Sequence, residues 1–126
     1  MYNIEDNYRF FEEPDYFNFG NRKENIIACQ LRNDASNLNY DLWCHHLTDD
    51  PRCSHCGDVN EDKDHFILSC PRYAVYRAVL QNVCGDLGVD LNVHNVLYGS
   101  DSLDFDDNIT LTSALHTYIK DCRRFI

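Results

Sequence analysis

The chain has 126 residues and a mass of 14.8 kDa, which leaves room for one compact domain. Hydrophobic residues make up 44% and charged residues 25%, so the composition excludes a wholly disordered or low-complexity chain. The 11 Lys and Arg against 21 Asp and Glu give a net charge of −10, which argues against strong, unassisted binding to nucleic acid.

The sequence contains no segment that predicts membrane insertion or export. Its longest uninterrupted apolar run, residues 26–29, is far shorter than the roughly 20 residues that cross a bilayer. The first residues, MYNIED, lack the basic start and the apolar stretch of a secretory signal. We therefore expect an intracellular protein of the cytoplasm or nucleus, without membrane contact and with reduced cysteines.

The hydrophobic pattern predicts a mainly α fold in two parts. Residues 1–20 mix aromatic and acidic side chains with neither a helical period nor a strand alternation, so we expect an irregular arm. Residues 21–126 are expected to form a single small helical domain. A zinc knuckle at residues 51–71 is predicted within it, between helices.

Two helices are predicted in the first part of this domain. Over residues 21–34, Ile27 and Leu31 lie four positions apart with Ile26 beside them, as on a helix buried on one side. After a polar break, Asn39 is a plausible N-cap for a second helix. The apolar positions of the second helix are Leu42, Trp43 and Leu47.

Further apolar segments follow the knuckle. Pro71 fits the first turn of a third helix that ends at Cys84 and Gly85. Its apolar stripe comprises Val75, Tyr76, Val79, Leu80 and Val83. A short apolar segment then runs to residues 96–99. The N-cap of a last helix is Asp106, Asp107 or Asn108. Its predicted buried face comprises Leu111, Leu115, Tyr118, Ile119 and Cys122.

Between Pro51 and Pro71 the chain reads C-x2-C-x8-H-x4-C, which is a zinc spacing. The four residues are Cys53, Cys56, His65 and Cys70. Two thiolates three positions apart can bind one ion from a tight turn, and Gly57 directly after them suits a turn with positive φ. Three thiolates and one neutral imidazole fill a tetrahedron, so no position is left for water or substrate. The pattern therefore predicts a structural Zn²⁺ site.

The second pair of ligands must come from another element. Residues 60–62, which read Asn-Glu-Asp, offer an N-cap and an acidic first turn for a short helix that carries His65. On an unbroken helix the side chains of His65 and Cys70 would point about 140° apart. We therefore expect Cys70 to lie at or beyond the end of the helix, where Pro71 supports a break.

Other readings of these residues have less support. The seven cysteines are an odd number and no export signal accompanies them, which disfavours disulfides. The cysteines outside the cluster are expected to be core thiols; they are Cys29, Cys44, Cys84 and Cys122. The remaining histidines near the cluster fit the spacing less well than His65; they are His45, His46 and His55. Common catalytic motifs are absent, including the H-x-E of the zinc nucleobase deaminases, so we expect no enzyme.

Three stretches carry a resemblance to a known family: PRCSHCG at residues 51–57, DHFILSCPRY at residues 64–73, and Arg77 after them. GNRK at residues 20–23 and IKDCRRF at residues 119–125 extend it. Together they resemble the C-terminal zinc-knuckle region of non-LTR retrotransposon reverse transcriptases. The resemblance implies zinc binding by the four cluster residues and assistance to a polymerase in handling RNA or target DNA, with no reaction of its own. The polymerase's catalytic aspartate motif is absent from the chain.

Two classes of function follow from the sequence. The first is a zinc-stabilised module that binds RNA or DNA weakly; its nearby cations are Arg52, Lys63, Arg72 and Arg77. The rings available to it are Phe66, Tyr73 and Tyr76, for which core packing is the alternative. The second is a zinc-stapled structural or protein-interaction domain with a basic partner, or a retrotransposon relic without retained function. A positive surface patch favours the first class, and a uniformly acidic surface favours the second.

Overall fold

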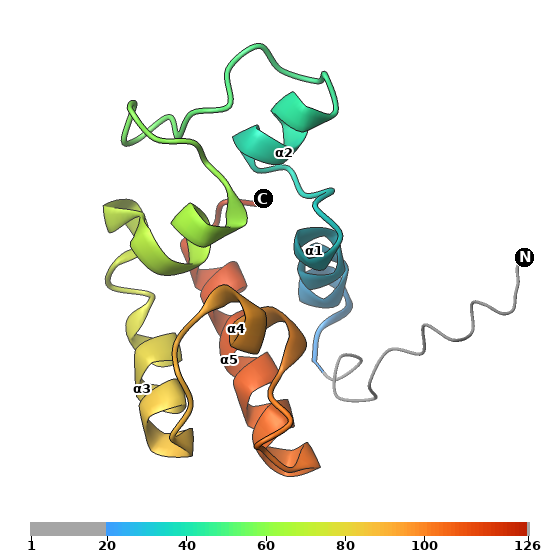
Figure 1. The fold of residues 1–126 in the computed structure, drawn as a ribbon, viewed down its shortest axis with the longest axis vertical. Coiled ribbons are helices and arrows are strands. Elements are labelled where there is room, and N and C mark those ends of the chain that lie inside the picture. The colour runs from blue at the N-terminus through green and yellow to red at the C-terminus, as the bar shows by residue number, and fades with distance from the viewer. Residues whose placement is uncertain (1–19, 126) are drawn as a thin grey trace, which may run out of the picture.

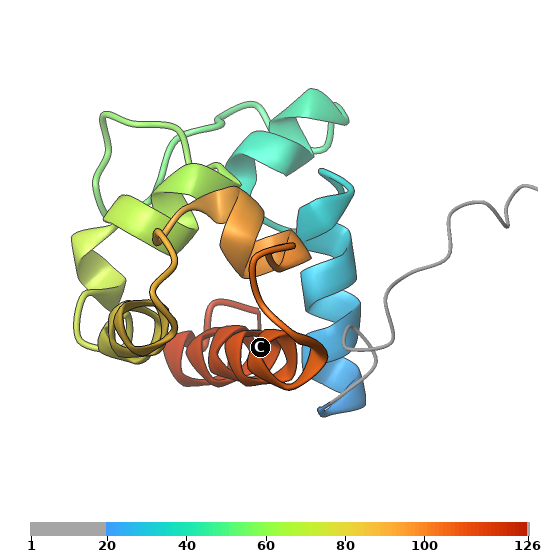
Figure 2. The same cartoon turned by 60° about the horizontal axis from the view of Figure 1, so that its bottom comes forward.

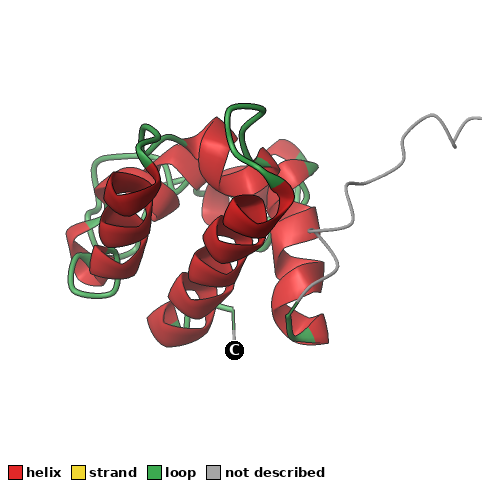
Figure 3. Ribbon diagram, turned by 90° about the horizontal axis from the view of Figure 1, so that it is seen from below, coloured by secondary structure: helices red, strands yellow, loops and turns green. Residues whose placement is uncertain are grey.

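A computed structural model describes residues 20–125 of the chain, and the arm expected over residues 1–20 lies almost wholly outside this range. The described residues form helices joined by loops, as Figure 3 shows, and the predicted mainly α fold is confirmed. The elements in chain order are α1 (Arg22–Arg32), α2 (Asn39–Cys44), a π turn (His65–Ser69), a 3-10 turn (Pro71–Tyr73), α3 (Ala78–Leu87), α4 (Val93–Tyr98) and α5 (Phe105–Cys122). Extended pairing among the described residues is limited to one antiparallel bridge between Arg52 and Asn60.

The long C-terminal helix α5 is the centre of the packing. It contacts α1, α3 and α4, and Figures 1 and 2 show these helices arranged around it. The predicted buried face is confirmed, since Leu111, Leu115, Tyr118, Ile119 and Cys122 all lie in the interior. Apolar side chains three or four positions apart share one face of a helix, so the spacing of the apolar residues in the sequence was sufficient to predict this face. Within residues 20–125 no helix has the length and apolarity that a bilayer crossing requires.

The predicted N-cap of α5 is wrong. Asp104 caps the helix, because its carboxylate accepts a hydrogen bond of 2.8 Å from the backbone N–H of Asp107. Asp106 and Asp107 lie in the first turn, where their negative charge is favourable beside the positive end of the helix dipole. Asn108 is buried, and its side chain instead bonds the backbone of Ser100.

The two helices predicted before the knuckle are present with changed details. Helix α1 buries Ile27 and Leu31 as expected, whereas Ile26 is 46% exposed. Asn39 is the first residue of helix α2 and not its N-cap. Its side-chain amide donates to the backbone carbonyl of Arg52. Trp43 and Leu47 are exposed, and Leu47 lies beyond the end of the helix. Of the three apolar residues predicted for this helix, two thus lie at the surface, and Leu42 is half-buried.

The third helix begins later and ends later than predicted. Pro71 opens only the 3-10 turn, and Val75 and Tyr76 of the predicted stripe lie exposed before α3. Helix α3 passes through Cys84 and Gly85 and ends at Leu87, where Gly88 has the positive φ (72°) of a C-terminal cap. The apolar segment that follows is itself a short helix, α4, with Asn92 as its N-cap.

Candidate metal centre

The first two cluster residues lie on a tight hairpin-like turn. The backbone N–H of Cys53 donates to the carbonyl of Val59 at 2.8 Å, and that of Gly57 donates to the carbonyl of Cys53 at 2.8 Å. Gly57 has φ of 80°, the left-handed region that a glycine enters without steric cost. The turn therefore forms as the sequence predicts, and it presents both sulfurs on one side.

A π turn positions the other two cluster residues. The Asp62 carboxylate stabilises the start of this turn, since it accepts a hydrogen bond of 2.8 Å from the backbone N–H of His65. The backbone N–H of Cys70 then donates to the carbonyl of His65, five residues earlier, at 2.8 Å. This wider ring brings residue 70 back over residue 65, whereas an α-helix would separate the two side chains. Cys70 itself is extended and lies beyond the last turn, which confirms the expected break before Pro71.

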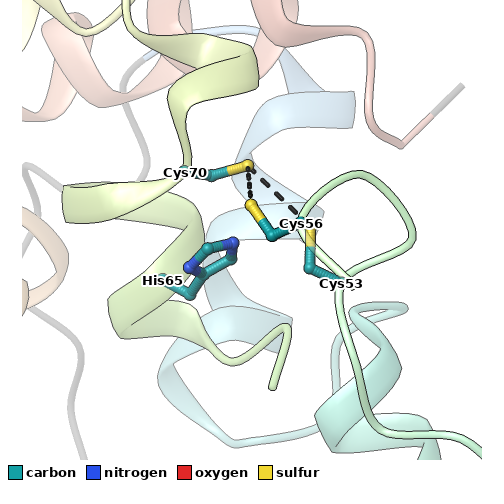
Figure 4. Close-up of side chains that lie close together, drawn as sticks. All are labelled: Cys53, Cys56, His65 and Cys70. Atoms are coloured by element: carbon teal, nitrogen blue, oxygen red, sulfur yellow. Dashed lines mark hydrogen bonds between the residues drawn. The ribbon is translucent and has the colours of Figure 1, made fainter. Parts of the chain in front are cut away.

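The four side chains converge on one point, as Figure 4 shows. Their ligand atoms all lie within 4.8 Å of one another. The Cys70 sulfur is 3.9 Å from the Cys53 sulfur and 4.0 Å from the Cys56 sulfur. A zinc ion with four tetrahedral ligands and bonds of about 2.3 Å to sulfur separates its sulfurs by about 3.8 Å. The cluster is a Cys3His set with the spacing of a tetrahedral metal site.

Two further observations fit a metal. The sulfurs are too far apart for a disulfide, whose S–S bond is about 2.05 Å, and the cysteines are free. The Nε2 atom of His65 is buried and has no hydrogen-bond partner among the described residues. A buried ring nitrogen normally has a partner, so a metal ion explains why this one lacks a protein donor or acceptor.

Burial makes the thiols of Cys56 and Cys70 weaker acids when no metal is bound. Desolvation raises the pKa of Cys70 to about 11, and it also raises the pKa of Cys56. A metal binds the thiolate, so loading the site must displace a proton from each of these two sulfurs at neutral pH.

We expect metal affinity to fall steeply as the pH falls. Below the thiol pKa values, each proton that must be released reduces the affinity about tenfold per pH unit, so release from Cys56 and Cys70 alone reduces it about a hundredfold per pH unit. Stabilisation by the metal is therefore present at high pH and is lost as the pH decreases. Competition with a chromophoric chelator at several pH values measures this slope. An affinity independent of pH would contradict thiolate ligation.

An ion pair between the buried carboxylate of Glu61 and the half-buried guanidinium of Arg124 ties the C-terminal segment to the turn. Glu61 is only 2% exposed, and both of its carboxylate oxygens accept from the guanidinium of Arg124, at 2.6 and 2.8 Å. The same carboxylate accepts from the backbone N–H of Asn39 at 2.8 Å. The prediction that Glu61 belongs to the acidic first turn of the short helix is wrong, because its side chain points inward to Arg124 and Asn39. Arg124 lies 63 positions away, so no local pattern could have identified the pair.

Arg77 is a core residue, which corrects its prediction as a nucleic-acid contact. It is 5% exposed, and its guanidinium donates to the carbonyls of Ile67 at 2.9 Å and Cys70 at 2.8 Å and to the Tyr118 hydroxyl at 3.2 Å. Tyr118 in turn donates to the carbonyl of Phe66. The carbonyls at the end of the π turn thus find their donors in Arg77 and Tyr118. A guanidinium held in this way is not available to a phosphate.

Arg77→Met should destabilise the protein by about 3 kcal/mol or more, because it leaves buried carbonyls without donors. Urea unfolding measures the change in the free energy of unfolding. The matched control is Arg72→Met, an exposed neighbour for which a change within about 0.5 kcal/mol is expected. Equal effects of the two substitutions would contradict the structural role of Arg77.

The other predicted cations lie nearer the surface. Arg52 is exposed but pairs with Asp50 at 2.9 Å, and Lys63 pairs with Asp34 at 2.7 Å. Arg72 is exposed and stacks over Tyr73, 5.6 Å from the ring centre. Of the predicted rings, Phe66 and Tyr73 are buried in the core, and Tyr76 is 43% exposed. The structure thus brings together the four predicted metal ligands, whereas of the four predicted cations one is buried and two are paired with carboxylates.

The cysteines outside the cluster divide between core and surface. Cys84 and Cys122 are buried as predicted, Cys29 is half-buried, and Cys44 is exposed, so it is not a core thiol. Of the competing histidines, His45 contacts the carbonyl of Asp34 at 3.1 Å, and His55 is exposed. His65 is the histidine that joins the metal cluster.

Comparisons with family models, with curated proteins and with solved structures found no match for this chain.

Proposed function

We propose that the protein is a non-catalytic zinc module, similar to the C-terminal region of non-LTR retrotransposon reverse transcriptases, that assists the handling of RNA or DNA inside the cell. The observation that carries the proposal is the closed Cys3His cluster. Zinc is the ion favoured by three sulfurs and one nitrogen at tetrahedral spacing. All four positions are taken by Cys53, Cys56, His65 and Cys70, so the ion would stabilise the fold and would have no position for a substrate.

A zinc ion with three thiolates has a net charge of −1, which bears on the role of the surrounding cations. Arg77 bonds the carbonyl of the ligand Cys70, and Arg124 is held at the turn by Glu61. Both guanidiniums therefore favour the charged, metal-loaded site. Among the predicted surface cations, Arg72 makes no ion pair within residues 20–125. Its guanidinium is therefore the one that we expect to contact a phosphate.

A second candidate is a protein-interaction domain with a basic partner. It is favoured by the surface at the end of α2, where Trp43 is 45% exposed and Leu47 is 72% exposed, followed by Asp49 and Asp50. Exposed apolar side chains beside acids are typical of a surface that a basic, amphipathic partner covers.

Nucleic-acid binding by the zinc-loaded protein is expected to be weak and strongly dependent on salt. Each phosphate neutralised on a duplex contributes about 0.9 to the slope of log affinity against log salt, and the net charge of −10 opposes binding at long range. We would measure binding of single-stranded and duplex RNA and DNA at about 50 mM and about 200 mM salt. The absence of binding at the lower concentration would contradict the nucleic-acid role and leave the protein-interaction role.

A further inference from the structure

The start of α1 and the end of α5 enclose a pocket of about 280 Å³ that contains none of the metal ligands. The two helices contact one another and lie side by side in Figures 1 and 2. The pocket is lined by three cations, one carboxylate and an apolar side that includes an aromatic ring. The volume is at the lower end of the range for ligand pockets, so it suits a ligand of the size of one nucleotide and not a duplex.

The cations of this pocket are Lys23, Lys120 and Arg123. All three are exposed, and none forms an ion pair with a carboxylate within the described part of the chain. Three like charges around one small pocket repel one another, and in a protein with a net charge of −10 they are an exception to the overall sign. An anion in the pocket would relieve this repulsion, and a phosphate offers acceptor oxygens to several donors at once.

Glu24 supplies a second, independent sign of a ligand. It is 7% exposed, and it lines both this pocket and an adjoining pocket of about 220 Å³. Its carboxylate makes no hydrogen bond or ion pair within residues 20–125. The helix dipole accounts for an acid in the first turn of α1. The Glu24 oxygens are not among the fully buried, unpartnered atoms of residues 20–125, so solvent reaches them through the pocket, and a ligand that displaces this solvent must supply hydrogen-bond donors in its place. A simple anion would not provide them, because it carries no donor.

The apolar side of the pocket has a ring in a defined position. Phe125 lines it together with Ile27 and Ile119. The Phe125 ring packs edge-on against Phe66, with their centres 5.3 Å apart and their planes at 77°. An aromatic ring that is held in place can contact a planar base at little further cost in entropy.

We propose that this pocket binds a guanine nucleotide, free or as an unpaired residue of a single strand, with its phosphate on the three cations and its base edge on Glu24. Guanine presents two adjacent donors, N1–H and the N2 amino group, which match the two oxygens of a carboxylate. Adenine presents one amino group beside an acceptor, so it would leave one carboxylate oxygen without a partner. This inference rests on the proposed nucleic-acid role and gives that role a location away from the knuckle.

The metal centre would support this pocket without touching the ligand. Arg124 is bound to Glu61 of the turn, and Phe125 packs on Phe66 of the π turn. The segment that carries Arg123 and Phe125 is thus attached to the two elements that hold the metal ligands. Removal of zinc is expected to weaken nucleotide binding as well as the turn.

The experiment is a titration of the zinc-loaded protein, followed by two-dimensional NMR, with guanosine 5′-monophosphate, adenosine 5′-monophosphate and inorganic phosphate. A bidentate contact to one base is worth about tenfold or more in affinity, so the guanine nucleotide should bind at least about tenfold more tightly than the adenine nucleotide. Glu24→Gln should remove this preference while leaving binding of the adenine nucleotide unchanged or slightly stronger. Lys120→Glu should weaken all three ligands. Zinc content and circular dichroism establish that each variant is folded.

Arg22→Glu is the matched control, since it makes the same kind of charge reversal at an exposed cation of α1 that does not line the pocket. A guanine preference that is absent, or that survives Glu24→Gln, overturns the inference, as does mononucleotide binding that Arg22→Glu weakens more than Lys120→Glu. A G-containing RNA hexamer distinguishes the two sources of the ligand: tighter binding than the mononucleotide indicates a strand, and equal binding indicates a free nucleotide. If Lys120→Glu does not weaken binding of the hexamer, the pocket is rejected as the binding site, and the proposed nucleic-acid role remains. Mononucleotide binding at the pocket with no binding of the hexamer supports the pocket and contradicts the proposed function.

Discussion

Cys56→Ser is expected to lose most of the zinc from a protein that otherwise holds about one equivalent per chain. Cys56 is half-buried, and its sulfur lies 4.0 Å from that of Cys70, so its loss opens one corner of the tetrahedron. A serine hydroxyl does not replace a thiolate as a zinc ligand, because it holds its proton at neutral pH. Metal analysis of the purified protein by plasma mass spectrometry measures the stoichiometry.

Cys44→Ser is the control for this substitution. Cys44 is exposed at the end of α2 and lies outside the cluster, so this variant should keep its full zinc content. Full retention of zinc by Cys56→Ser, or equal losses from the two variants, would reject the ligand assignment.

Removal of zinc with a chelator should unfold the turn at residues 51–61 before α5. Structural zinc in small peptides contributes on the order of 10–16 kcal/mol, so the segment that depends on it most should open first. The turn exposes most of its side chains, and the backbone bonds that close it are few. Helix α5 has apolar contacts with α1, α3 and α4 that do not involve the metal. Hydrogen exchange after chelation should therefore show early loss of protection at Cys53 and Gly57.

The same experiment compares two parts of the metal region. Phe66 and Ile67 are fully buried, and Tyr118 and Arg77 bond their carbonyls, so protection near the π turn should be lost later than in the turn at residues 51–61. Loss of protection in α5 at the same rate as in the turn would mean that the zinc site and the helical core unfold as one unit.

The metal ligands could be predicted from the sequence because the requirement is local. Cys53 and Cys56 belong to one tight turn, and Gly57 after them permits its positive φ. The break before Pro71 followed from the geometry of a helix and the restriction that proline imposes. The buried face of α5 followed from the helical period alone. In each case, neighbours in sequence contain the physical cause.

The role of each cation was decided by tertiary structure. Arg77, Arg72 and Arg52 look alike as charges near the cluster, yet Arg77 is buried, Arg72 lies on a ring and Arg52 pairs with Asp50. A buried guanidinium requires several acceptors in fixed positions, and those of Arg77 come from a π turn and from α5. No pattern around residue 77 contains that information.

The limits of the third helix have the same explanation. The apolar stripe through Val75 and Tyr76 has a helical period, but in the structure both side chains face solvent and α3 starts at Ala78. Periodicity describes which residues could share a buried face, whereas the position of the neighbouring elements decides whether that face is covered. The sequence by itself therefore determined the mainly α class, the four converging ligands and the buried face of α5. Only the tertiary structure decided where Arg77, Glu61 and Arg124 lie, because their partners are distant in the chain and a buried charge is stable only where folding brings those partners to it.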